Sequence, residues 1–187
     1  MKKILYLMPC LFLLSFLQDD DLIVWKQDRP LTWADFKGKP AKRFAVASTT
    51  YNILKKVKIG DEHSAQVTIE TVFYCKDSWR KGAWADSTVL VHEQKHFDIA
   101  ELYARKYRKL VKTGSYNDYK SLYDACDSLY NVIDKEMDVY QDLYDEETDG
   151  STNGKEQRRW NKKVIDEINA LKNYEATDFE VTFSKKH

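Results

Sequence analysis

The sequence comprises 187 residues, of which 43% are hydrophobic, 32% are charged and 13% are aromatic. This length suits a single domain with its own core, and so many large rings exclude a disordered chain. Thirty basic and thirty acidic residues cancel, so the overall charge indicates neither nucleic acid nor an anionic membrane as a partner.

The N-terminus has the pattern of an export signal. Two lysines precede an almost wholly apolar run from Ile4 to Leu17, and acidic residues at 19–21 end it. A basic start and a short apolar stretch are typical of a signal peptide, and this run is too short to span a bilayer comfortably. We therefore expect a signal peptide at 1–17, although its retention as an anchor stays open, and a single domain at 18–187. The mature protein should be secreted or periplasmic, with no stable membrane insertion beyond the signal.

Two cysteines, Cys75 and Cys126, lie in the expected mature chain. An oxidising compartment would allow them to form one disulfide. Two separate buried thiols are the alternative. They are too few, and too far from the histidines in sequence, to indicate a cysteine-type zinc site.

Residue patterns predict strands and helices along the rest of the chain. Alternating and β-branched residues predict strands at 22–25, 44–59 and 67–75, and a short terminal strand at 179–183. Apolar spacings of three and four predict helices from a cap at 86–88 to residue 110, from about 119 to 144 and over 160–171, with further helical turns at 32–36 and after 77–79. The expected fold is α+β and zincin-like: a small antiparallel sheet built on a long hairpin, packed on the first long helix, with further C-terminal helices.

The first long helix carries a His-Glu-x-x-His motif at residues 92–96. His92 and His96 are one helical turn apart, so both imidazoles project from one face and can bind one metal ion, which we expect to be Zn²⁺. Glu93 is placed to reach a water molecule at that metal as a general base. Ile99 and Tyr103 continue the stripe of His92, which indicates that the histidines face inward. The alternative is a solvated helix that carries two histidines by accident.

Catalytic zinc requires a third protein ligand. His63 and His187 are the remaining histidines, and His63 fits the tip of the predicted hairpin better than a metal site. Glu101 lies nearly opposite His92 on a continuous helix. Unless the helix breaks after His96, Glu101 cannot reach the same metal, so it is not the first choice of ligand and we expect it at the surface or beside the site.

Glu136 is the predicted third ligand. It lies one turn after Ile133 and one turn before Tyr140, so a carboxylate interrupts the apolar face of the second helix. A buried carboxylate is costly unless it is paired or bound to a metal. Asp142 and Asp145 are the nearest rivals, and an exposed Glu136 at the edge of the stripe is the alternative.

Several segments resemble a bacterial family. They are Leu31 to Gly38, His92 to Arg105, Tyr144 to Thr148 and Gln157 to Trp160. With these segments the chain resembles the domain-of-unknown-function 922 family, which is described as predicted secreted zinc-dependent proteases of zincin-like type. The resemblance implies export to the cell envelope and supports His92, Glu93 and His96 as site residues.

One position departs from the family pattern. Many relatives carry histidine soon after the Tyr-Asp-x-x-Thr segment, where this chain has Gly150. If that histidine is the usual third ligand, this chain would recruit Glu136 or Asp145, bind zinc weakly or be inactive.

These patterns favour hydrolysis of a peptide or protein substrate. Zinc held by His92 and His96 would activate a water molecule, and Glu93 would take its proton. Tyr140 or Tyr144 could stabilise the oxyanion, or simply pack in the core. The alternative function is a catalytically inactive zincin-fold binding module of the envelope. A third interpretation is a structural metal clip without an open coordination position.

Overall fold

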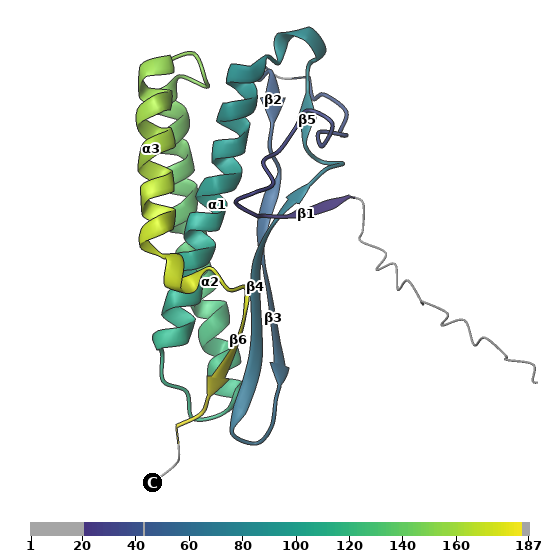
Figure 1. The fold of residues 1–187 in the computed structure, drawn as a ribbon. Helices are drawn as coiled ribbons and strands as arrows, with labels where there is room; N and C mark the ends of the chain where they lie inside the picture. The colour runs from purple at the N-terminus through teal and green to yellow at the C-terminus, as the bar shows by residue number, and fades with distance from the viewer. Residues whose placement is uncertain (1–20, 43, 185–187) are drawn as a thin grey trace, which may run out of the picture.

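The computed structural model describes residues 21–42 and 44–184, which form an α+β fold. Three long helices pack together on one side, and an antiparallel sheet with one long hairpin lies on the other (Figure 1). The helices are α1 (Ser87–Thr113), α2 (Tyr119–Thr148) and α3 (Gly154–Ala170). The predicted signal peptide at 1–17 lies outside the described residues. Within the described residues, no helix has both the length and the apolar character needed to cross a membrane.

Strand β4 (Ser64–Tyr74) is the centre of the four-stranded sheet. The predicted hairpin is confirmed, since β3 (Tyr51–Ile59) pairs antiparallel with β4 over nine residues. On the other side of β4, β1 (Leu22–Val24) pairs with its C-terminal end and β6 (Asp178–Thr182) with its N-terminal end. The predicted terminal strand is therefore confirmed as β6, which returns from the helical layer to complete the sheet.

The helices begin where the sequence places capping residues. The side chain of Asp86 accepts hydrogen bonds from the backbone of Thr88 and Val89 at the start of α1. Asp118 and Ser121 form a capping box at the start of α2. Such caps satisfy amides that have no partner inside the helix. The three long helices are confirmed, each extending a few residues beyond at least one predicted end.

The prediction of one continuous strand at 44–59 is wrong. The chain forms β2 (Ala47–Ser48), leaves the extended ladder at 49–50 and then enters β3. At this break the backbone amide of Thr50 donates to Ser78 Oγ over 2.9 Å. Strand β2 pairs with β5 (Trp79–Arg80), where the sequence pattern had predicted the start of a helix. The break directs the segment before β3 towards α1.

The predicted helical turn at 32–36 is a hydrogen-bonded turn without a helix. Asp35 determines it, because its carboxylate accepts from the backbone amide and the hydroxyl of Thr32 and from the guanidinium of Arg29. Burial alone would raise the pKa of Asp35, but these hydrogen bonds outweigh burial and lower it. A carboxylate that accepts from both the start of the turn and a cation competes with helix formation.

A buried ionic cluster joins α1 to the sheet. Glu101 is 3% exposed and accepts hydrogen bonds from Thr71 on β4 and from Arg105 and Arg108 on its own helix. Arg108 also donates to the backbone oxygen of Ile69. The expectation that Glu101 lies at the surface or beside the histidines is therefore wrong. A carboxylate this buried needs cationic partners, and it has two.

The two described cysteines are separate buried thiols. Cys75 packs with Phe36, Phe73 and Phe97, whereas Cys126 belongs to the main core between the helices and the sheet. Burial raises the pKa of both thiols. Of the two possibilities that the sequence left open, the structure has the one without a disulfide.

Candidate metal centre

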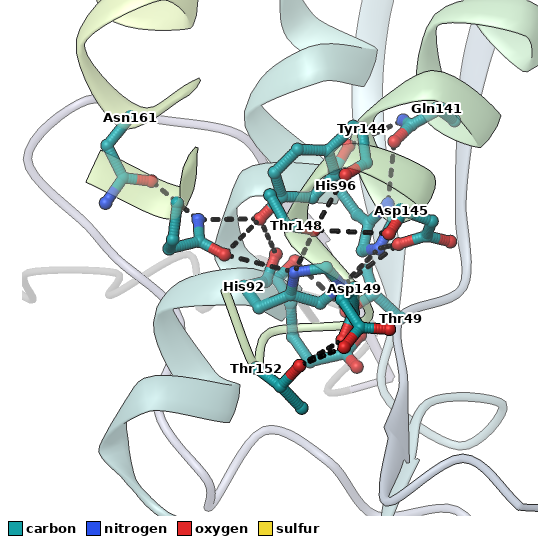
Figure 2. A network of polar contacts seen from close by, with 12 residues as sticks. Thr49, His92, His96, Gln141, Tyr144, Asp145, Thr148, Asp149, Thr152 and Asn161 are labelled. Carbon is teal, nitrogen blue, oxygen red and sulfur yellow. Dashed lines mark hydrogen bonds and ion pairs between the residues drawn. The ribbon is translucent and has the colours of Figure 1, made fainter. Parts of the chain in front are cut away.

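Two imidazole rings on α1 meet at the surface of the helix that faces α2 (Figure 2). The Nε2 atoms of His92 and His96 are 3.1 Å apart, and the rings are arranged edge to face. The side chain of His92 is 6% exposed and that of His96 is 14% exposed. The spacing of four residues thus places both rings inward on one face, as the sequence pattern predicts.

Asp145 on α2 completes a group of three potential metal ligands. Its Oδ1 atom lies 3.0 Å from Nε2 of both His92 and His96. Donor atoms at the corners of a zinc tetrahedron with bonds of roughly 2.0–2.1 Å are about 3.3 Å apart. Two imidazole nitrogens and a carboxylate are also a donor set that zinc accepts in catalytic sites. The three side chains therefore fit a zinc ion in both spacing and chemistry.

The electrostatics of the group couple the aspartate to the histidines. Burial opposes a charged His96, but the hydrogen bond and negative charge of Asp145, together with the charge of Glu93, raise its pKa. Burial would likewise raise the pKa of Asp145, yet its contacts with the two imidazoles lower it well below the ordinary value. The site therefore favours an ionised Asp145 that faces a protonated imidazole. A bound cation would supply positive charge at the same position.

The structure places Glu136, the predicted third ligand, away from the histidines. Glu136 is exposed and lines a separate surface hollow with Tyr103 and Tyr140. It lies nine residues before Asp145, which is about 180° around a continuous helix. Asp145, named only as a rival from the sequence, occupies the position expected of Glu136. The other rival, Asp142, lines the cleft beside the site but is outside the group of three.

Two glutamines contact the outer nitrogens of the imidazoles. Gln141 Oε1 on α2 is 2.7 Å from His96 Nδ1, and Gln157 Oε1 on α3 is 3.2 Å from His92 Nδ1. Both glutamines are buried, with exposures of 6% and 4%. Neither glutamine was predicted from the sequence as a site residue. Gln141 nevertheless falls in the buried stripe of α2, at a position where the helical spacing predicts an apolar residue. All three helices therefore contribute to the site.

The two tyrosines suggested for the oxyanion do not line the cleft. Tyr144 stacks on His92 with ring centres 4.7 Å apart, and its hydroxyl contacts the backbone oxygen of His92 and the side chain of Gln157. Tyr140 donates to Glu167 on α3. Burial raises the pKa of both phenols. They support the helices, and neither is among the residues that line the cleft.

A cleft of about 720 Å³ opens over the three potential metal ligands. It is lined on one side by the segment 44–49, which contains β2, and on the other by residues of α1 and α2. Glu93 is 5% exposed and lines this cleft, as does Tyr51 at the start of β3. The hydroxyl of Thr49 donates to the backbone oxygen of Glu93 over 3.2 Å and ties the segment to α1. A cleft of this size can accommodate a few residues of an extended peptide.

Comparison with known proteins assigns the chain to a family. Residues 31–155 match the family described as "Bacterial protein of unknown function (DUF922)", and the chain belongs to this family. The matched range contains His92, His96 and Asp145 but ends before Gln157. No curated protein and no solved structure matches the chain. The family assignment confirms the resemblance seen in the sequence, and its description leaves the activity open.

Proposed function

We propose that this protein is an exported zinc-dependent peptidase of zincin-like type. One observation carries the proposal: Asp145 Oδ1 and the Nε2 atoms of His92 and His96 lie 3.0–3.1 Å from one another at the base of a cleft. Glu93 lines the same cleft, next to the first histidine. Three donors and an adjacent carboxylate in one cleft are the parts that a His-Glu-x-x-His hydrolase needs.

His92, His96 and Asp145 would hold the zinc ion. When bound there, zinc would lower the pKa of a water molecule and polarise the carbonyl group of the scissile bond. Asp145 is the most exposed of the three, since 53% of its side chain is accessible. The open side of the group therefore faces the cleft, where a substrate can enter.

Glu93 acts as the general base and later as the general acid. Its carboxylate takes a proton from the attacking water and returns it to the leaving amine. Its low exposure limits competing contacts with solvent. The hydrogen bond from Thr49 to its backbone oxygen fixes this residue against the opposite wall of the cleft.

The segment 44–49, which contains the extended strand β2, provides the substrate wall. Within it, β2 pairs with β5 along one edge, and the segment lines the cleft. An extended backbone beside a cleft can bind a peptide by strand addition, with main-chain hydrogen bonds that accept many sequences. Tyr51 is the phenol among the described lining residues, and we assign to it the role of oxyanion donor that Tyr140 and Tyr144 cannot fill.

The test is hydrolysis of a broad peptide library by the mature protein and by Glu93→Gln, with zinc content measured for both. We expect Glu93→Gln to keep near-stoichiometric zinc and to lose at least about 100-fold in turnover, because general-base catalysis contributes roughly 10²–10⁴-fold. Glu136→Gln is the matched control and should keep both, because Glu136 is an exposed glutamate that does not line this cleft. Equal turnover in Glu93→Gln and the wild type would refute this assignment, and a zinc-loaded wild type that cleaves no peptide would refute the proposal.

A further inference from the structure

The hydrogen bonds around His96 determine which ring nitrogen carries the proton. The Nε2 group of Gln141 donates to the backbone oxygen of His96 over 2.9 Å. A carbonyl oxygen can only accept, so the amide of Gln141 can be oriented in one way alone. Its Oε1 atom then faces His96 Nδ1 at 2.7 Å. Because Oε1 also can only accept, Nδ1 carries the hydrogen and the Nε2 atom of neutral His96 is left with its lone pair.

The same reasoning applies to His92 through Thr148. The hydroxyl of Thr148 donates its single proton to the backbone oxygen of Tyr144 over 2.7 Å. Its Oγ1 atom lies 3.4 Å from His92 Nδ1 and can only accept from it. Gln157 Oε1, at 3.2 Å from the same nitrogen, is a second acceptor. Both partners are buried, Thr148 completely, so water does not replace them.

These contacts oppose the effect of Asp145. A carboxylate oxygen 3.0 Å from both Nε2 atoms would by itself draw the imidazole hydrogen to Nε2. That tautomer would place a hydrogen on each nitrogen that has to bind the metal. Acceptors on the Nδ1 side are therefore needed to keep the Nε2 lone pairs free (Figure 2).

We propose that Gln141 and the pair Gln157–Thr148 are positioning residues that hold His96 and His92 in the Nδ1–H tautomer, with both Nε2 lone pairs directed at the metal position beside Asp145. The significance of this arrangement rests on the proposed function, because only a bound cation requires free Nε2 atoms. The amides and the hydroxyl are neutral, so they select the tautomer without adding a charge to the site. Partners of this kind orient metal-binding histidines in general.

The test reads the tautomers directly, by long-range ¹H–¹⁵N NMR of the metal-free protein at a pH where both imidazoles are neutral. In the wild type both rings should show a protonated Nδ1. Gln141→Leu should move His96 to the Nε2–H form and leave His92 unchanged. The double variant Gln157→Leu/Thr148→Val should move His92 to the Nε2–H form and leave His96 unchanged. A protonated Nε2 on both histidines of the wild type, or an unchanged His96 in Gln141→Leu, would overturn the proposal.

Zinc affinity provides the second readout. Gln141→Leu and Gln157→Leu/Thr148→Val should each weaken zinc binding by about 10- to 100-fold. Gln141→Glu, which keeps an acceptor at Nδ1, should retain the Nδ1–H tautomer and bind zinc more tightly than Gln141→Leu. Equal affinities of the wild type and Gln141→Leu would overturn the proposed role.

A matched control separates positioning from a general loss of stability. Gln94 is on the same helix, and its side chain bonds the backbone amide of Leu31 and the carboxylate of Asp98 without touching a histidine. Gln94→Leu should leave both tautomers and the zinc affinity unchanged, and altered tautomers in this variant would contradict the proposal. A wild type that binds no zinc would refute the proposed function but not the tautomer assignment, because the tautomers are read in the metal-free protein.

Discussion

Replacing Asp145 by asparagine tests whether the carboxylate on α2 is a metal ligand. The variant keeps the size of the side chain and removes its charge, while the two histidines of α1 stay in place. Zinc bound by four protein ligands gains roughly 10–16 kcal/mol, or about 2.5–4 kcal/mol for each ligand. At about 1.4 kcal/mol for each tenfold change, losing one of three donors should weaken binding by roughly 100- to 1000-fold. We expect the lower end, because the amide oxygen of asparagine is still a weak donor.

The assay is competition for zinc against a chromophoric chelator. Asp142→Asn is the matched control, because Asp142 is on the same helix and lines the same cleft but lies outside the group of three donors. Losing an exposed charge of this kind changes binding by about 1 kcal/mol or less, roughly fivefold. The reasoning is refuted if Asp145→Asn stays within about fivefold of the wild type, or if Asp142→Asn loses as much affinity as Asp145→Asn.

Three further predictions concern stability and the thiols. Glu101→Gln should lower the free energy of unfolding in urea by about 3–5 kcal/mol, because Arg108 is left buried without its anion; a loss below about 1 kcal/mol would contradict the ionic cluster. The pKa of Asp35 is lowered from its ordinary value of 3.8, so its contribution is present above that value and is lost as the pH falls through the folded pKa. Asp35→Asn should therefore cost about 1–2 kcal/mol at neutral pH and progressively less as the pH falls below 3.8; a loss that does not change with pH would exclude the charge as the cause. Cys75 and Cys126 should react with a thiol reagent only after unfolding, and then as two free thiols; a mass change on reduction would instead indicate a disulfide.

The arrangement of strands and helices could largely be predicted from the sequence. The hairpin, the three long helices and the terminal strand follow from local residue patterns and caps. The break at residues 49–50 could not be predicted, because it depends on Ser78, a residue 28 positions away from Thr50 that binds its backbone amide. The prediction of a helical turn at 32–36 was wrong for a more local reason. The carboxylate of Asp35 accepts a hydrogen bond from Thr32, as it would at the start of a helix, but it also binds Arg29.

The group of three potential metal ligands was only partly predictable, and helix geometry explains why. Spacing alone places His92 and His96 on one face of α1, because both belong to a single helix. The third donor depends on which flank of α2 faces α1. Glu136 and Asp145 lie next to the buried stripe on opposite flanks, each one residue from a buried position, Met137 or Tyr144. The apolar pattern fixes the stripe but not the flank, so the sequence could not distinguish the two carboxylates.

The cleft also bears on the choice between an enzyme and an inactive binding module. The inactive alternative arose because Gly150 stands where the family resemblance led us to expect a histidine. Gly150 lines the cleft with φ of +53°, and a Cβ atom there would meet nothing within 4 Å. The position is therefore open space at the edge of the site, and Asp145 already supplies a third donor. An inactive binding module would have no use for Glu93, a residue that is 5% exposed and lines the cleft. Burying a carboxylate costs free energy, and the proposed role of Glu93 as a general base would account for that cost.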